Sequence, residues 1–405
     1  MNIIDRWHEI QKSEDYISIE NTLKERSTQI FLLAIGFRIA MYLFGAIIMT
    51  MYGEFENGIT FSSFLQSWKR WDANGYLSIA ENGYSAWLEN GMYVCLVFYP
   101  MYSWLVRFAV LFLGNYVLAG LAVSTLGFGV ACVYFDKLMC LDYSEELSGN
   151  AILGMAVFPF SFFFGAVMTE SVFVAISTAF FYYLRKHNWT VVTILGFFAC
   201  LTKVQGILLT LPVLVEILYH NEILLLIKER KWKRIFKDVL LTGVGCVPML
   251  LGFFVYLWIN YAVAGNPFIF LEYQNKVWGQ SLISVCDTIK YIFKYMSDSW
   301  YTSVGMCIWI PESILIFVYL AAIVYGIRHK MRPLYIAYLI VWFVFIYSAS
   351  WLLSAGRYTT SALPLFMIEG KMLADHPKLK VPVLGFSFAL MVIYYSGYLT
   401  GKQIM

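Results

Sequence analysis

The chain has 405 residues, of which 60% are hydrophobic and only 14% are charged, and its net charge is +3. Soluble domains carry about 25% charged residues, so this composition excludes an ordinary soluble enzyme and a disordered protein. The small net charge excludes a nucleic-acid binder. Because the apolar residues come in long runs rather than alternating segments, we expect an all-α polytopic membrane protein and not a membrane barrel.

Long apolar runs predict about eleven membrane-spanning helices. In chain order they are Thr28–Tyr52, Tyr116–Phe135, Asn150–Val167, Thr169–Leu184, Thr190–Leu201, Gly206–Tyr219, Asp238–Val263, Ile310–Ile327, Pro333–Leu352, Thr359–Leu373 and Val381–Leu399. The polar residues 1–27 do not fit a signal peptide. The seven cysteines show no metal-binding spacing, and we expect them to be small packing residues.

Basic clusters set the expected orientation, because Lys and Arg concentrate in cytoplasmic loops. The clusters are Arg185–Lys186, Lys228–Lys237 and Arg328–Arg332. With these and the N-terminus inside, residues 53–115 and 264–309 become two large outer segments, and the C-terminus is outside. Since both ends of 53–115 are then outside, Val94–Leu113 is expected to lie in the outer leaflet without crossing.

Residues 1–405 are expected to form a single transmembrane domain. We find no second half that repeats the first, in the same sense or inverted. Many transporters are built from such repeats, so this weighs against a transporter.

The first outer segment contains a carboxylate among residues suited to sugar chemistry. Asp72 is flanked by Arg70, Trp71 and Asn74, which together offer a base, a cation, an amide and an aromatic surface for stacking. The alternative is an amphipathic helix at the membrane interface, where Trp and Tyr are common.

Three further polar breaks fall at the same predicted face of the membrane. They are Glu170 in MTES, Lys203 with Gln205 in TKVQG, and Arg357 in SAGRY. Glu170 could instead belong to a Thr/Glu helix cap, and the lone cations could instead extend to lipid headgroups. Two carboxylates and two cations converging on one face are nonetheless suited to a phosphate-containing substrate. Arg38 lies within the first span, and we expect a structural pair there rather than a role in turnover.

The second outer segment begins with Asn266-Pro267, a turn signal. Trp278 and Gln280 could hold a sugar, although an interfacial aromatic belt explains Trp278 equally well.

Six blocks in order across Trp68–Phe366 resemble the PIG-V type mannosyltransferases of the GT-C superfamily. The blocks are RWDANGYLSIAENGY, FYPMYSWLVR, FPFSFFFGAVMTES, LTKVQGILL, GNPFIFLEYQNKVWGQ and SAGRYTTSALPLF. The resemblance implies a GT-C type bundle with outer juxtamembrane helices. The family pattern more often carries Arg where Lys203 stands and Asp where Asn266 stands, so a role for position 266 is in doubt.

The resemblance also implies residue roles. Asp72 and Glu170 would be the catalytic acidic residues, and Lys203, Arg357 and Arg70 would bind the donor phosphate. The predicted sugar and acceptor contacts are Trp71, Asn74, Tyr84, Gln205, Gln274, Trp278 and Gln280.

The implied activity is transfer of a hexose, with mannose expected, from a polyprenyl-phosphate donor to a lipid-linked or glycan acceptor on the outer face. No cofactor or nucleic-acid partner is expected, and a divalent metal bound by Asp72 and Glu170 stays open. The expected location is a bacterial plasma membrane, or the endoplasmic reticulum if the chain is eukaryotic. The alternatives are a transporter or flippase of a lipid-linked sugar and a structural membrane protein.

Overall fold

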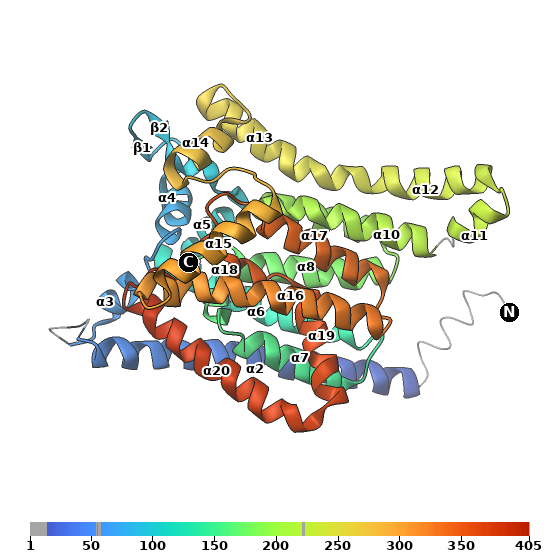
Figure 1. Ribbon diagram of the computed structural model, residues 1–405, viewed down its shortest axis with the longest axis horizontal. Helices are drawn as coiled ribbons and strands as arrows, with labels where there is room; N and C mark the ends of the chain where they lie inside the picture. The colour runs from blue at the N-terminus through green and yellow to red at the C-terminus, as the bar shows by residue number, and fades with distance from the viewer. Residues whose placement is uncertain (1–13, 54, 56–57, 221–222, 405) are drawn as a thin grey trace.

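In the computed structural model the chain is an all-α bundle (Figure 1). The structure describes residues 14–53, 55, 58–220 and 223–404, and for residues 14–23, 223–224, 238–242 and 244–245 it describes only the backbone. Its α-helices are α2 (Glu14–Met51), α3 (Phe61–Gln66), α4 (Ala73–Asn82), α5 (Pro100–Leu113), α6 (Tyr116–Met139), α7 (Glu145–Val157), α8 (Glu170–Arg185), α9 (Trp189–Thr202), α10 (Thr210–His220), α11 (Ile223–Lys228), α12 (Trp232–Cys246), α13 (Leu251–Ala264), α14 (Ile269–Trp278), α15 (Val285–Ser299), α16 (Ile310–Arg328), α17 (Pro333–Ile346), α18 (Ala355–Thr359), α19 (Leu363–Asp375) and α20 (Pro377–Leu399).

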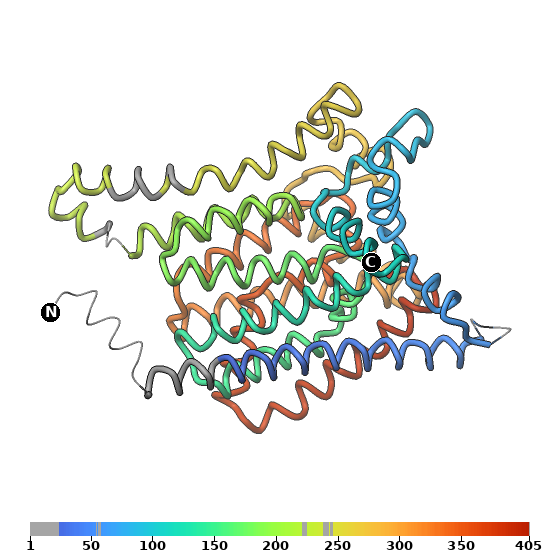
Figure 2. The backbone as a smooth tube through the Cα atoms, turned by 180° about the vertical axis from the view of Figure 1, so that it is seen from behind, coloured from blue at the N-terminus to red at the C-terminus, as the bar shows by residue number. Residues whose placement is uncertain are grey.

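Five helical segments within the described residues are long and apolar enough to cross a membrane. They are Lys24–Met51, Tyr116–Met139, Val247–Ala264, Gly305–Arg328 and Pro377–Leu399. The other predicted spans correspond to shorter helices that run along the same bundle (Figure 2). The polytopic all-α class is thus confirmed, and eleven crossings remain a prediction.

The bundle has two ends of different chemistry. At one end, hereafter the basic end, Arg185 pairs with Asp142, and Arg332 lies between Asp142 and Glu216. At the opposite end, hereafter the site end, lie α3, α4, α14 and α15 (Figure 1). Both predicted outer segments therefore lie at one end of the bundle.

Three predicted spans are wrong in their bounds. Asn150–Val167 is not one helix, because α7 ends at Val157, just before Phe158-Pro159, and proline disfavours a helical residue before it. α17 ends at Ile346 rather than Leu352, because residues 348–350 hydrogen-bond to residues 281–283 instead. A non-helical step after Thr359 separates α18 from α19, so 359–373 is not continuous either.

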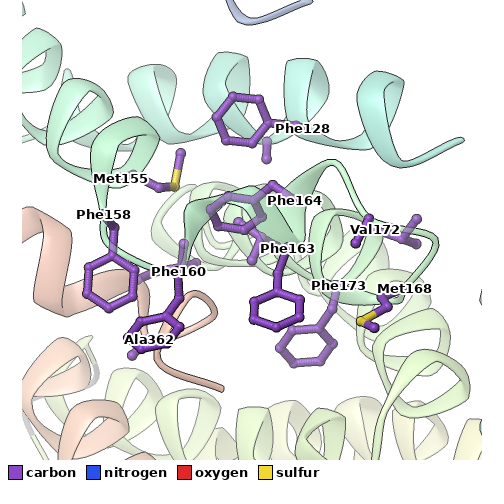
Figure 3. Packing of buried hydrophobic residues seen from close by; sticks show 14 of the residues in the cluster. Phe128, Met155, Phe158, Phe160, Phe163, Phe164, Met168, Val172, Phe173 and Ala362 are labelled. Atoms are coloured by element: carbon purple, nitrogen blue, oxygen red, sulfur yellow. The ribbon is translucent and has the colours of Figure 1, made fainter. Parts of the chain in front are cut away.

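The segment between α7 and α8 is irregular yet buried. Its phenylalanines pack against α6, α8 and the residues before α19 (Figure 3). Three of its carbonyl groups accept from side chains: Arg38 Nη1 donates to Ser161 O at 2.8 Å, Tyr42 to Gly165 O at 2.8 Å and Ser124 to Ala166 O at 2.6 Å. Others accept from amides of the segment itself. Non-helical backbone at membrane depth is tolerated only when it is satisfied inside the protein. The segment thereby fixes the position of Glu170, the first residue of α8.

Arg38 thus has the structural partner expected of it, a backbone carbonyl. Its guanidinium also lies 4.0 Å from the centroid of the Phe128 ring, a cation–π contact that favours the charged form in an apolar setting.

Residues 58–115 fold against the site end. A two-residue hairpin, β1 (Leu88–Glu89) and β2 (Met92–Tyr93), turns at Asn90-Gly91, which is the preferred sequence for such a turn. A short 3₁₀ segment, Val94–Val97, leads to Pro100 at the start of α5. Arg107 of α5 donates to Ala80 O of α4 at 2.6 Å, and Tyr102 donates to Gly120 O of α6 at 2.9 Å. α5 is thereby fastened to neighbours at the site end.

Candidate functional site

Four charged residues from four distant segments meet in one cluster at the site end. Arg357 donates from Nε to Glu170 Oε1 at 2.6 Å and from Nη1 to Asp72 Oδ2 at 2.5 Å. Lys203 Nζ donates to the same Glu170 Oε1 at 2.7 Å. The cluster holds two acids and two cations and is therefore balanced in formal charge.

Asp72 enters the cluster from a strained turn. The preceding residue, Trp71, has φ +51°, a left-handed conformation that costs a residue with a Cβ roughly 1–2 kcal/mol. Asp72 precedes α4 but its side chain makes no capping bond; it binds Arg357 instead. Such strain at a turn is typical of functional sites.

Glu170 is fully buried at the first position of α8, where the helix dipole favours an anion. Thr169 makes no side-chain capping bond, so the structure does not have the cap that was the alternative role for this pair. Oε2 of Glu170 is buried without a hydrogen-bond partner among the described residues. Lys203 and Arg357 both bind the other oxygen, Oε1.

The two cations are held inside the protein rather than at lipid headgroups. Lys203 is 7% exposed and Arg357 is 5% exposed. Lys203 follows α9 in an extended conformation. Arg357 lies on α18, whose first amide, Ala355 N, donates to the buried carboxylate of Glu312 at 3.1 Å. The geometry therefore disfavours the headgroup alternative for both side chains.

An aromatic cleft of about 330 Å³ adjoins the cluster. It is lined by Trp71, Asp72, Gly75, Trp87, Val94, Phe98, Val277, Trp278, Trp351 and Leu353. Asp72 is the one member of the charged cluster in this lining, and its side chain is 25% exposed. A molecule in the cleft can therefore reach the Asp72 carboxylate, while tryptophan rings offer the flat apolar surfaces on which sugars stack.

Gly75 is required by the shape of this cleft. A Cβ at this position would lie 2.4 Å from the Phe98 ring, so only glycine lets that ring approach the α4 backbone.

Two of the predicted sugar contacts, Trp71 and Trp278, line the cleft. Gln274 donates to Gln280 at 2.6 Å, and Gln280 donates to Trp351 O at 3.0 Å. This chain of bonds joins α14 to the segment before α18, so the two glutamines hold the cleft wall together.

The remaining predicted contacts do not line the cleft. Arg70 donates to Ser67 O at 3.1 Å and to Leu399 O at 2.7 Å, and it is not among the partners of Asp72 or Glu170. Tyr84 is buried and donates to Phe98 O at 2.8 Å. Asn74 is exposed on α4, and Gln205 is buried beside Lys203.

Sequence reasoning missed several residues that complete the site. Trp87, Phe98 and Trp351 line the cleft, and Tyr76 lies near Arg357 and Thr169, where burial raises the pKa of its hydroxyl far above the usual range of a phenol. Tyr76 is therefore neutral at physiological pH. Tyr76, Trp87 and Phe98 lie in the predicted first outer segment. Their position in that segment was the sequence feature that could have pointed to them as site residues.

The Arg357 guanidinium connects the two acids. Within the part of the chain that the structure describes, no group of three or more His, Cys, Asp or Glu side chains is arranged to hold a metal.

No described protein family and no curated protein matches the sequence. Among solved structures, the chain is similar to ArnT from Cupriavidus metallidurans bound to undecaprenyl phosphate, with 13% identity, a TM-score of 0.50, and coverage of 82% of this chain and 71% of that one. The apo state of the same protein matches with 15% identity, a TM-score of 0.47 and coverage of 82% and 70%. The likeness to the first structure shows that the two chains share a polytopic all-α fold.

Proposed function

We propose that the protein is a glycosyltransferase that moves a hexose, expected to be mannose, from a polyprenyl-phosphate donor to a lipid-linked or glycan acceptor. The reaction takes place at the site end, on the outer face of a bacterial plasma membrane. The observation that carries the proposal is the position of Asp72, which faces an aromatic cleft and is bound by Arg357, itself bound to Glu170.

Two further observations support an enzyme over the alternatives. The four charged residues of the cluster lie at one end of the bundle rather than at its middle, where transporters place their binding sites. A guanidinium between two acids also suits a structural membrane protein, as Arg332 between Asp142 and Glu216 shows. The Asp72–Arg357 pair differs because Asp72 opens onto an aromatic cleft. The fold likeness to ArnT bound to undecaprenyl phosphate fits a lipid-linked donor.

Asp72 acts as the general base. The acceptor hydroxyl oxygen attacks the anomeric carbon, its proton passes to the Asp72 carboxylate, and the bond from the anomeric carbon to the phosphate oxygen breaks. The bonding electron pair leaves with the phosphate, and direct displacement inverts the anomeric centre. General-base help of this kind contributes roughly 10²–10⁴-fold.

Lys203 and Arg357 supply the positive charge for the leaving phosphate. Arg357 commits Nε to Glu170 and Nη1 to Asp72, so Nη2 is the nitrogen available to a phosphate oxygen. Glu170 holds both cations in place before the donor binds. Fixed donors in a buried site stabilise developing charge without reorganisation.

A membrane assay tests the proposal. Vesicles containing the full chain are incubated with radiolabelled polyprenyl-phosphate-mannose and a lipid extract of the source cell, in parallel with the glucose-labelled donor. A labelled product that requires Asp72 is expected, and the donor that yields it identifies the sugar. If neither donor is consumed, the proposal is wrong; if label crosses the bilayer without a product, the chain is a flippase.

A further inference from the structure

Another cavity among the described residues lies at the basic end, away from the aromatic cleft. It has a volume of about 390 Å³ and is lined by His187, Glu216, Tyr219, His220 and Arg332. These residues come from the turn after α8, the end of α10 and the turn before α17 (Figure 1). The cavity therefore lies where several helices of the bundle end, the depth at which lipid headgroups meet a membrane protein.

A buried acid holds the polar wall of this cavity in place. Glu216 is 1% exposed, and its Oε1 lies 3.1 Å from His187 Nε2 and 3.4 Å from Arg332 Nη1. The guanidinium of Arg332 also lies 5.6 Å from the Tyr219 ring centroid, and its Nε lies 3.7 Å from Asp142 Oδ1. Arg332 is thus fixed from two sides while its side chain remains 34% exposed.

Two histidines lie on the same wall. The rings of His187 and His220 are 3.7 Å apart. His187 has φ +53° just after the end of α8, a position where glycine is the usual residue. A histidine at this position is strained because its side chain has a Cβ.

Exposed cations lie close in sequence to two of the lining residues, His187 and Arg332. Lys186 and Lys330 flank the two turns and are exposed, as is Arg328. In the lining itself Arg332 is balanced by Glu216, so the neighbouring exposed cations give this region its excess of positive charge. Arginine and imidazole together suit the oxygens of a phosphate group.

We propose that this cavity binds the phosphate of an anionic phospholipid headgroup, with Arg332 and His220 as its direct contacts and Glu216 and His187 as the residues that position them. The site is independent of the proposed transfer reaction. A soluble phosphate offers the same chemistry, but the location at the helix ends favours a lipid.

The test measures lipid-dependent stabilisation of the full chain. Purified protein is placed in phosphatidylcholine nanodiscs with or without phosphatidylglycerol, and its melting temperature and bound lipid, by native mass spectrometry, are recorded. Phosphatidylglycerol should raise the melting temperature. Arg332→Gln should weaken its binding about tenfold, as expected for one charge-assisted hydrogen bond.

Two variants separate binding from folding. His220→Gln removes an imidazole that forms no ion pair among the described residues, so it should fold normally and still lose affinity for the anionic lipid. Lys378→Gln, an exposed cation at the start of α20 outside the cavity lining, removes the same charge and should bind as the wild type does.

The outcomes are decisive. Equal stabilisation by phosphatidylcholine alone, or an unchanged phosphatidylglycerol effect in both Arg332→Gln and His220→Gln, would overturn the proposal. If inorganic phosphate at matched concentration gives the full effect and competes with the lipid, the cavity takes soluble phosphate and the lipid assignment is wrong.

Discussion

Asp72 and Glu170, which lie at the N-terminal ends of α4 and α8, are held by a single guanidinium, that of Arg357. Because Lys203 binds the same oxygen of Glu170, a change in any of the four residues alters the charge balance of the others. The predictions below separate the roles of these residues.

Asp72→Asn should abolish transfer, by about 100-fold or more, while leaving the fold intact. The amide oxygen can still accept the Arg357 hydrogen bond, but the side chain can no longer take a proton. Product formation in the vesicle assay measures the effect. Glu81→Gln, an exposed acid on the same helix, is the control and should retain normal activity; an Asp72→Asn enzyme within a few-fold of wild type removes the residue from the base role.

Glu170→Gln should destabilise the protein, because two buried cations lose their shared counter-charge. Removing one partner of a buried ion pair costs about 3–5 kcal/mol. The double variant Glu170→Gln/Lys203→Met leaves Arg357 paired with Asp72 and should be more stable than Glu170→Gln alone. Melting temperatures in detergent compare the three proteins, and a double variant less stable than the single one would contradict this account of the cluster.

Lys203→Gln and Arg357→Gln should each lower catalytic efficiency about 10–150-fold, the range for loss of one charge-assisted hydrogen bond of roughly 1.5–3 kcal/mol. A loss in kcat indicates action on the developing phosphate charge, and a rise in KM indicates anchoring of the donor. Arg357→Lys should recover only part, because a point charge cannot bridge two carboxylates. Normal kinetics in both Gln variants would exclude the donor-site role.

Trp71→Gly should be more stable than Trp71→Ala by about 1 kcal/mol. Both variants lack the indole ring, but only alanine retains the strain of a left-handed residue. Thermal or denaturant unfolding in detergent measures the difference. Equal stability would show that the turn relaxes without the ring and that no strain is stored before Asp72.

Cysteines introduced at Asn90 and Asn115 in a Cys-free background should be labelled from the same side of the membrane. Both positions are exposed and flank α5, which is predicted not to cross. Arg230→Cys, in the basic turn between α11 and α12, should be labelled from the opposite side. If the labels at 90 and 115 appear on opposite sides, α5 crosses and the outer placement of Asp72 and Glu170 fails.

The charged cluster could be predicted because charge is rare in this chain. Glu170, Lys203 and Arg357 each interrupt an apolar stretch, and Asp72 lies among polar residues of the first outer segment. The predicted topology places all four at one end. The aromatic wall could not be predicted in the same way: with 19% Phe, Trp and Tyr, one tryptophan such as Trp351 carries no signal of its own. It reaches the cleft only because residues 348–350 bond to residues 281–283.

The helical class could be predicted from apolar runs, but the bounds of some helices could not. Residues 158–168 are as apolar as a spanning helix. Composition alone does not distinguish a spanning helix from an irregular segment that is buried inside the protein. Pro159 was the available sign of a break, and Asn90-Gly91 was a similar sign of the hairpin.

The irregular segment before Glu170 also constrains how the protein is made. A carbonyl group cannot enter a bilayer unsatisfied, and three carbonyl groups of the segment depend on side chains. Their donors, Arg38, Tyr42 and Ser124, all precede the segment in the chain. During synthesis α2 and α6 therefore reach the membrane first, and the phenylalanine-rich segment enters against partners that are already there. The order of residues along the chain is thus also an order of assembly. Glu170 enters the membrane only after α2 and α6, the helices that hold the segment before it.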